Sequence, residues 1–256
     1  MVNYLAWPHY LKVDSIKESE LAAFARLERI VPPKYLEMDR DARTEDKTSV
    51  GLALAISECV SSMRAKMNSE ISARIIIGGK VAGYSGILPG LVEEFILAYQ
   101  ARLPIFLIGA FGGCSKLLIK AISEKETPEK LKYNAQIRDV TEKLGLAKHY
   151  EEFKEKLSKR KDFKVEARNL ILPISRYRKM ERVISEIREK RGFSGLNNGL
   201  DKLENEVLFK TDDLRTINGL ILKGIKKRLK NEKPINQPKN KTRQISNMKM
   251  KRKRRR

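Results

Sequence analysis

The chain has few of the residues that build disulfide frameworks, zinc sites or catalytic triads. Its 256 residues include two cysteines, Cys59 and Cys114, which show no CxxC spacing and have no histidine at ligand spacing. Two such cysteines cannot make a disulfide framework and do not have the pattern of a zinc site. The two histidines, His9 and His149, are far apart and neither adjoins a Ser, Cys or Asp constellation. The sequence therefore predicts no metal site, no resident cofactor and no catalytic triad.

Long apolar runs are also missing. None approaches the roughly 20 residues that span a bilayer, and the N-terminal segment MVNYLAWPHY lacks the charged and apolar regions of a signal peptide. We therefore expect a cytoplasmic protein with no membrane partner. An apolar fraction of 41% over 256 residues is enough for one or two domains with a hydrophobic core.

Acidic residues are scarce at the C-terminal end. The chain carries 54 Lys and Arg against 32 Asp and Glu, a net charge of +22, and residues 223–256 supply 16 of the basic residues and one acidic residue, Glu232. This end is rich in Lys, Asn, Gln and Pro, so it buries too little apolar surface to offset the entropy of ordering. We predict a disordered basic tail over residues 231–256 that attracts nucleic-acid phosphates weakly. The alternative is a solubilising or read-through end without a selected role.

Two short β-branched runs between Arg74 and Gly113 each open into a glycine-rich loop. The runs are Ile75–Ile77 and residues 105–108, and a helical apolar pattern lies between them. This order predicts a strand–helix–strand unit of a parallel sheet, with the glycines at the carboxyl ends of the strands. Ligands of open α/β sheets bind at that edge, where glycine allows close approach to a phosphate or ribose and helix N-termini offer N–H donors.

The loop after the first run reads GGKVAGYSG, from Gly78 to Gly86. It is not a Walker A loop, because Lys80 precedes the later glycines, and it is not GxGxxG. Lys80 can still pair with a phosphate, and Tyr84 can stack on a base or close the pocket. In the second loop, Phe111 stands between glycines and either flanks a ligand, which we favour, or fills the turn.

Leu88-Pro89-Gly90 leads into a helix that carries Glu93 and Glu94. A proline near the first turn suits a helix start, and carboxylates there are favoured by the helix dipole. The two glutamates therefore have two open interpretations. Either they stabilise the helix end, or one faces the loop to bind ribose hydroxyls or act on a glycosidic bond.

The coarse pattern divides the chain into three parts. For residues 1–125 the pattern predicts a Rossmann-like α/β core. This core starts with a strand or extended arm that ends at Pro8, and a helix over residues 15–30 and a helix from about Thr48 follow. Residues 126–230 predict a mainly helical extension packed on that core, with helices over about 177–190, 201–209 and 212–229. The basic tail follows.

GGKVAGYSGILPGLVEE followed by PIFLIGAFGG resembles the SLOG superfamily of Rossmann-like nucleotide-binding domains, which includes the lysine-decarboxylase-like phosphoribohydrolases. The sequence looks most like the double-SLOG group of bacterial conflict systems. The pairs Met63-Arg64 and Glu204-Asn205, and the segments Asn3–Pro8 and Asn198–Leu200, agree with it. The resemblance covers roughly Asn3 to Leu229.

The resemblance implies binding of a nucleotide or ADP-ribose-like signal and a sensor role in antiviral defence, with the signal passed to an effector domain. It implies that Arg64 contacts a phosphate and that Gly78, Gly79, Lys80, Gly90, Glu93, Gly109, Gly112 and Gly113 line the site. The predicted ligand site adds the loop residues Gly83, Tyr84, Gly86, Pro89 and Phe111.

Two departures from the family pattern matter. The hydrolase branch carries PGGxGTxxE, whereas Pro89-Gly90-Leu91-Val92-Glu93-Glu94 lacks the second glycine and the Gly-Thr pair. This favours sensing, and the alternative is a nucleotide phosphoribohydrolase that uses Glu93 or Glu94. A full Rossmann-like domain also opens with a strand and its own glycine loop. We therefore expect a C-terminal half whose partner half lies upstream or was lost, with exposed apolar faces that favour a homo-oligomer.

Overall fold

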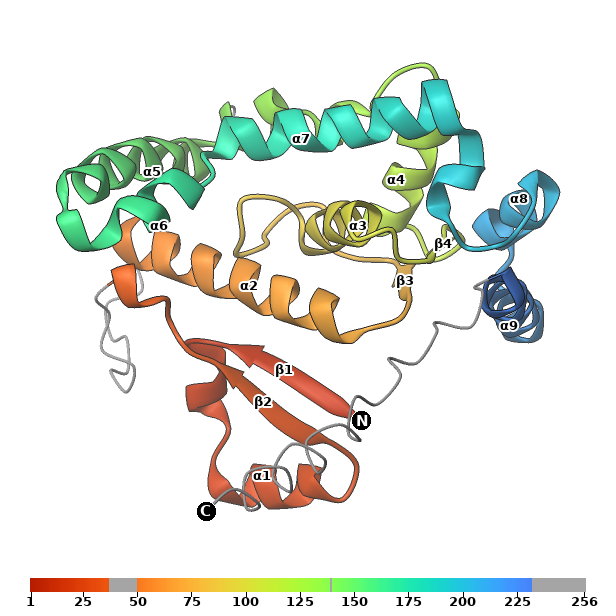
Figure 1. Cartoon of the computed structure of the whole chain (residues 1–256), viewed down its shortest axis with the longest axis horizontal. Coiled ribbons are helices and arrows are strands. Elements are labelled where there is room, and N and C mark those ends of the chain that lie inside the picture. The colour runs from red at the N-terminus through yellow and green to blue at the C-terminus, as the bar shows by residue number, and fades with distance from the viewer. Residues whose placement is uncertain (37–49, 139, 232–256) are drawn as a thin grey trace, which may run out of the picture.

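The computed structural model describes residues 1–36, 50–138 and 140–231 (Figure 1). The predicted disordered tail, from residue 232 on, lies outside the described residues. The elements follow one another as β1 (Val2–Ala6), α1 (Ser15–Ala22), β2 (Arg26–Ile30), α2 (Val50–Glu70), β3 (Arg74–Ile77), α3 (Gly90–Gln100), β4 (Ile105–Ile108), α4 (Gly113–Ser123), α5 (Thr141–Lys159), α6 (Lys164–Asn169), α7 (Pro173–Ser185), α8 (Lys202–Lys210) and α9 (Leu214–Asn231).

The strands form two small parallel sheets. In one, β1 pairs with β2 and Val2 lies opposite Arg26; in the other, β3 pairs with β4 and Arg74 lies opposite Ile105. Helix α2 lies between the β1–β2 sheet and α3 (Figure 1). The predicted class, α/β with parallel strands followed by a mainly helical section, is confirmed, although the described strands form two sheets of two strands.

The prediction of a helix over residues 15–30 is wrong for its second half. Helix α1 ends at Ala22, and Arg26–Ile30 is strand β2. Because β1 offers a backbone partner to these five residues, tertiary pairing overrides the local helical pattern. The N-cap of α1 is Asp14, whose carboxylate accepts the Lys17 N–H at 2.8 Å, and the predicted cap, Ser15, is the first helical residue.

The strand–helix–strand unit is confirmed as β3–α3–β4. All four residues of β4 are buried, because Ile105 and Leu107 face the main core while Phe106 and Ile108 face α8 and α9. Strand β3 is covered on one face, so Ile76 is buried while Ile75 and Ile77 stay 49% and 44% exposed. The two strands therefore end side by side, with their glycine loops at the same edge.

The main core joins the α/β part to the helical section. Phe95 of α3 and Leu118 of α4 belong to one buried cluster with Tyr177, Met180 and Ile184 of α7, and α7 runs above α3 and α4 (Figure 1). Each such large apolar side chain stabilises the fold by roughly 1.5–3 kcal/mol when fully buried. The helical section therefore packs directly on α3 and α4 through α7. No helix among the described residues combines the length and apolar character needed to cross a membrane.

Candidate functional site

The first glycine loop leaves β3 through two residues in the left-handed region of backbone space. Gly78 has a φ of +62° and Gly79 a φ of +93°, values that favour glycine. A Cβ on Gly79 would also lie 2.5 Å from Leu91 Cδ1. The next side chain, Lys80, is exposed. The loop therefore turns sharply at the strand end and presents a cation to solvent.

The two glycine loops bind each other. The N–H groups of Cys114 and Ser115 donate to the carbonyl oxygens of Gly79 (3.0 Å) and Gly78 (2.9 Å), and Ser115 Oγ accepts the Gly78 N–H at 2.9 Å. A Cβ on Gly113 would lie 2.3 Å from the Gly79 oxygen, so this close approach requires glycine. These contacts bring Gly78, Gly79 and Gly113 together. They also occupy two N–H groups at the start of α4 that an anion would otherwise use.

The second loop is held on its other side by α8. Gly109 N–H donates to the Phe209 carbonyl at 3.1 Å, and a Cβ on Gly109 would lie 2.5 Å from that oxygen. Phe111 is 49% exposed, and Gly112 has a φ of +73° with open space where a Cβ would stand. Gly109 lines a cavity of about 1200 Å³ between α4 and α8, whose apolar wall includes Phe193. The loop thus borders a large hollow through Gly109 and Ala110 and also carries an exposed aromatic ring, that of Phe111.

The later part of the first loop faces the helical section. The Tyr84 hydroxyl donates to Gln136 Oε1 at 2.5 Å and lies 3.2 Å from the Tyr177 hydroxyl, and burial raises the pKa of Tyr84 to about 12. Lys143 Nζ donates to the carbonyl oxygens of Tyr84 (2.9 Å) and Gly86 (2.6 Å). Gly83 is exposed, with a φ of +65°. The Tyr84 ring is therefore engaged inside the protein, whereas Lys80 is exposed.

Lys143 comes from α5 and holds this loop. Burial lowers its pKa to about 8, although Glu142 opposes the shift. Its nitrogen also lies 4.5 Å from the centroid of the Tyr84 ring. No sequence motif marks Lys143, since its role depends on the packing of α5 against a loop more than fifty residues earlier.

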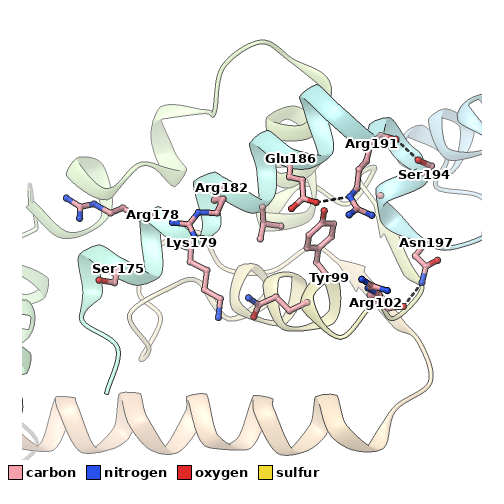
Figure 2. A pocket seen from close by; sticks show the side chains of 13 residues that line it. Tyr99, Arg102, Ser175, Arg178, Lys179, Arg182, Glu186, Arg191, Ser194 and Asn197 are labelled. Carbon is pink, nitrogen blue, oxygen red and sulfur yellow. Dashed lines mark hydrogen bonds and ion pairs between the residues drawn. The ribbon is translucent and has the colours of Figure 1, made fainter. Parts of the chain in front are cut away.

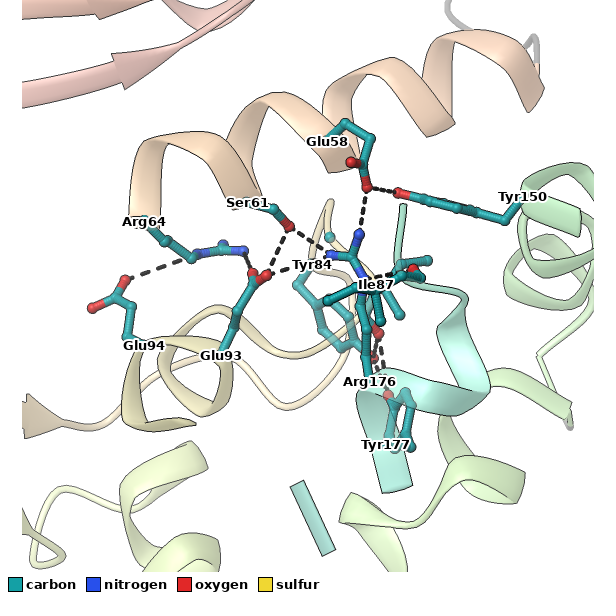
Figure 3. Close-up of polar contacts among 12 residues, drawn as sticks. Glu58, Ser61, Arg64, Tyr84, Ile87, Glu93, Glu94, Tyr150, Arg176 and Tyr177 are labelled. Carbon is teal, nitrogen blue, oxygen red and sulfur yellow. Dashed lines mark hydrogen bonds and ion pairs between the residues drawn. The ribbon is translucent and has the colours of Figure 1, made fainter. Parts of the chain in front are cut away.

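Arg64 belongs to α2, and its guanidinium reaches the start of α3, where it pairs with both glutamates of that helix (Figure 3). It hydrogen-bonds to Glu93 and lies 3.9 Å from Glu94, which also pairs with Arg74 at 2.9 Å. A Cβ on Gly90 would lie 2.7 Å from Arg64 Nη2, so glycine makes room for the guanidinium; Gly86 is buried beside the same group. Pro89 is buried and caps α3. The predicted residues Arg64, Gly86, Gly90 and Glu93 therefore come together as a structural unit.

The pairing extends to α7 through Arg176. This residue hydrogen-bonds to Glu58 and to Ser61 Oγ (2.7 Å), and lies 3.4 Å from Glu93 Oε1. Tyr150 donates to Glu58 at 2.6 Å. We call the six charged residues the ion network: Glu58, Arg64, Arg74, Glu93, Glu94 and Arg176.

The ion network balances three carboxylates with three guanidinium groups, and most of it is buried. The side chains of Arg176 and Glu58 are 10% and 9% exposed. Burial raises the pKa of Glu94, although Arg74 and Arg64 oppose the shift. Sequence reasoning missed Glu58, Arg74 and Arg176, because nothing local shows that they meet.

A cavity of about 250 Å³ borders the network and is lined by Glu58, Ser61, Glu93, Arg176 and Lys179, among others. This volume is below the roughly 300–1,000 Å³ of typical small-molecule sites. The Glu93 carboxylate also already accepts hydrogen bonds from Ser61 (2.7 Å) and Arg64. The geometry therefore favours the first interpretation of Glu93, in which it stabilises the start of α3.

The described residues contain no group of three or more His, Cys, Asp or Glu side chains arranged to hold a metal ion.

Comparison with curated proteins and with solved structures gives no match. The model of the family described as SLOG cluster2 matches residues 1–208, which is more than half of the chain. The predicted SLOG membership is therefore confirmed. The chain belongs to the SLOG cluster2 family, and this membership indicates a nucleotide-related function.

Proposed function

We propose that this chain binds a nucleotide or nucleotide derivative at the paired glycine loops and acts as a sensor in a bacterial antiphage or conflict system. The observation that carries the proposal is the position of the two glycine loops, which lie in contact with each other at the carboxyl ends of β3 and β4. In open α/β sheets this edge is the ligand-binding edge. Family membership supplies the nucleotide class.

Lys80 and Phe111 are the side chains suited to recognise such a ligand. Lys80 is exposed and forms no ion pair with a described residue, so its ammonium group is available to a phosphate. Phe111 is 49% exposed in the second loop, and base–aromatic stacking is worth about 1–3 kcal/mol per base. Together they offer one contact for the phosphate end and one for the base end of a nucleotide.

A sensor explains the glutamates better than the hydrolase alternative does. A hydrolase needs a carboxylate facing the glycosidic bond, whereas Glu93 is engaged by Ser61, Arg64 and Arg176. Freeing it requires breaking a largely buried ion pair, which is strongly unfavourable. The sensor passes on its state through loop contacts, for example those of Lys143, to the helical section and an effector.

Isothermal titration of the full chain against ADP-ribose, its cyclic forms and common nucleotides tests the proposal. We expect at least one ligand to bind, and Lys80→Ala to weaken that binding about tenfold, because it removes a charge-assisted hydrogen bond. Lys12→Ala, which removes an exposed lysine from the 3₁₀ turn His9–Lys12 after β1, is the matched control and should bind normally.

Two results would contradict the sensor. One is the absence of binding by every ligand of the panel, or binding that Lys80→Ala leaves unchanged. The other is release of free base from a nucleoside monophosphate that Glu93→Gln abolishes, since this would identify a phosphoribohydrolase.

A further inference from the structure

A second polar hollow lies between the C-terminal end of α3 and helix α7 (Figure 2). Its volume is about 850 Å³. Arg102, on its wall, precedes β4 by only a few residues, so the hollow lies at the amino ends of the strands. The glycine loops follow the carboxyl ends. The two places are therefore at opposite edges of the β3–β4 sheet.

The lining is strongly basic. Five cationic side chains line the hollow: Arg102, Arg178, Lys179, Arg182 and Arg191. We call this hollow the basic groove. Glu186 is the acidic residue of the lining, and it pairs with Arg191 at 2.8 Å. Among the described residues the other four cations form no ion pair. Four of the five positive charges on this lining therefore form no ion pair with a described carboxylate.

These charges repel one another in the free protein. Arg178 and Arg182 are four residues apart on α7, a spacing at which like charges destabilise a helix. Lys179 lies between them in sequence, and burial together with the neighbouring Arg176 lowers the pKa of Lys179, while Glu93 opposes the shift. A bound polyanion would relieve this repulsion.

The walls of the groove are preformed. Asn197 stands in the left-handed region with a φ of 53°, and its side-chain amide donates to the Arg102 carbonyl. This contact attaches the turn after α7 to the C-terminal end of α3. Ser175 and Ser194 add hydroxyl groups to the lining. A preformed site loses less conformational entropy on binding than a flexible one.

We propose that the basic groove binds a ligand that carries two or more phosphate groups, at a site separate from the glycine loops. The groove has the size of a site for one small ligand, roughly 300–1,000 Å³. A single phosphate would neutralise only part of its charge. A nucleic-acid strand is less suited, because sites for single strands combine cations with aromatic rings on which successive bases stack, whereas this lining contains one aromatic residue, Tyr99.

Isothermal titration of the full chain with inorganic tripolyphosphate and with ATP tests the proposal. We expect both to bind, and Arg178→Gln combined with Arg182→Gln to weaken both about tenfold or more, because two charge-assisted contacts are lost. Arg102→Gln, on the opposite wall, should weaken binding as well. Equal affinities for tripolyphosphate and ATP would identify the phosphate chain as the recognised group. Tighter binding of ATP would indicate a further contact with the nucleoside, and either result supports the proposal.

The control removes two charges with the same spacing from another helix. Lys164→Gln combined with Arg168→Gln changes exposed residues of α6 outside the groove and should leave binding within about twofold.

Three results would overturn the proposal. The first is no tripolyphosphate binding by the intact chain, and the second is an equal loss in the groove variant and the α6 control, which would indicate nonspecific attraction. The third is a groove-dependent affinity shown only by oligonucleotides and rising with their length, which would indicate a nucleic-acid surface. Circular dichroism of each variant confirms that it is folded.

Discussion

The ion network and the basic groove use arginines of the same helix in opposite ways. Arg176 is buried and shared between Glu58 and Glu93, whereas Arg178, two residues later, is exposed without an acidic partner among the described residues. The difference lies in the neighbouring helices. Helices α2 and α3 supply carboxylates to Arg176, while the C-terminal end of α3 offers Arg102, another cation. A guanidinium that the fold neutralises is structural, and one that it leaves unneutralised is available to an outside anion.

Arg176→Ala tests the structural side and should have the largest effect. Removing one partner of a buried ion pair leaves the other charge uncompensated, at a cost of about 3–5 kcal/mol in the free energy of unfolding. Urea denaturation measures it. The matched control is Arg178→Ala on the same helix, which should change stability by no more than about 0.5 kcal/mol. Equal effects of the two substitutions would remove the distinction between network and groove.

Lys143 is a third case, a largely buried cation that bonds to carbonyl oxygens and not to a carboxylate. Its pKa in the folded chain, about 8, lies below the ordinary 10.5 of lysine. Between these values the unfolded chain binds more protons, so the stability that depends on Lys143 rises with pH. The stability of the natural chain relative to Lys143→Met should rise by about 2 kcal/mol at most from pH 7 to 10.5, since solvent screens part of the effect.

Denaturation curves of both proteins at several pH values give this difference in the free energy of unfolding. Titrating groups that the two proteins share, such as the cysteines, contribute equally to both and drop out of the difference. A difference that stays flat or falls over this pH range would contradict the burial of Lys143 in the folded chain.

Gly90→Ala tests how rigid the ion network is. The added Cβ would meet Arg64 Nη2 at 2.7 Å, so we expect a loss of about 1 kcal/mol from displacing a paired guanidinium. In an Arg64→Ala background the same substitution should cost nothing, because the obstacle is gone. A double-mutant cycle by urea denaturation measures this coupling, and identical effects in both backgrounds would show that Arg64 moves freely.

Arg182→Gln should have the smallest effect, of the opposite sign. It removes one like charge four residues from Arg178, and should stabilise the chain by about 0.2–0.5 kcal/mol at low salt. The gain should vanish at about 1 M salt, where the Debye length is roughly 3 Å. Destabilisation at low salt would mean that Arg182 has a stabilising role in the free protein.

The parts of the fold set by local sequence were predictable. Strand β3, helix α3 and strand β4 follow from short apolar runs and glycines, and Gly78 and Gly79 begin the glycine-rich loop that the pattern predicted after β3. Strand β2 was not predictable from its own residues, since it is a strand only because β1 lies beside it.

The residues of the candidate site could be named from the sequence as a prediction, but the contacts that these residues make could not. The glycines at 86 and 90 were expected to approach a ligand, yet at both positions a Cβ would come close to Arg64. Tyr84 was predicted to contact the ligand, and nothing in the sequence indicated that its hydroxyl donates to Gln136, 52 residues later. Glu58 and Arg176 are 118 residues apart, and no local pattern reports such a pair.

Hydrogen exchange with and without ligand tests the central claim most directly, which is that the paired glycine loops form the nucleotide site. The full chain would be studied with the tightest binder among ADP-ribose, its cyclic forms and common nucleotides. We predict slower amide exchange in residues 78–86 and 109–116 with every ligand that binds, whereas residues 175–197 around the basic groove are protected in addition only by ligands that carry two or more phosphate groups. Protection absent from both loops, or confined to residues 175–197, would contradict the claim.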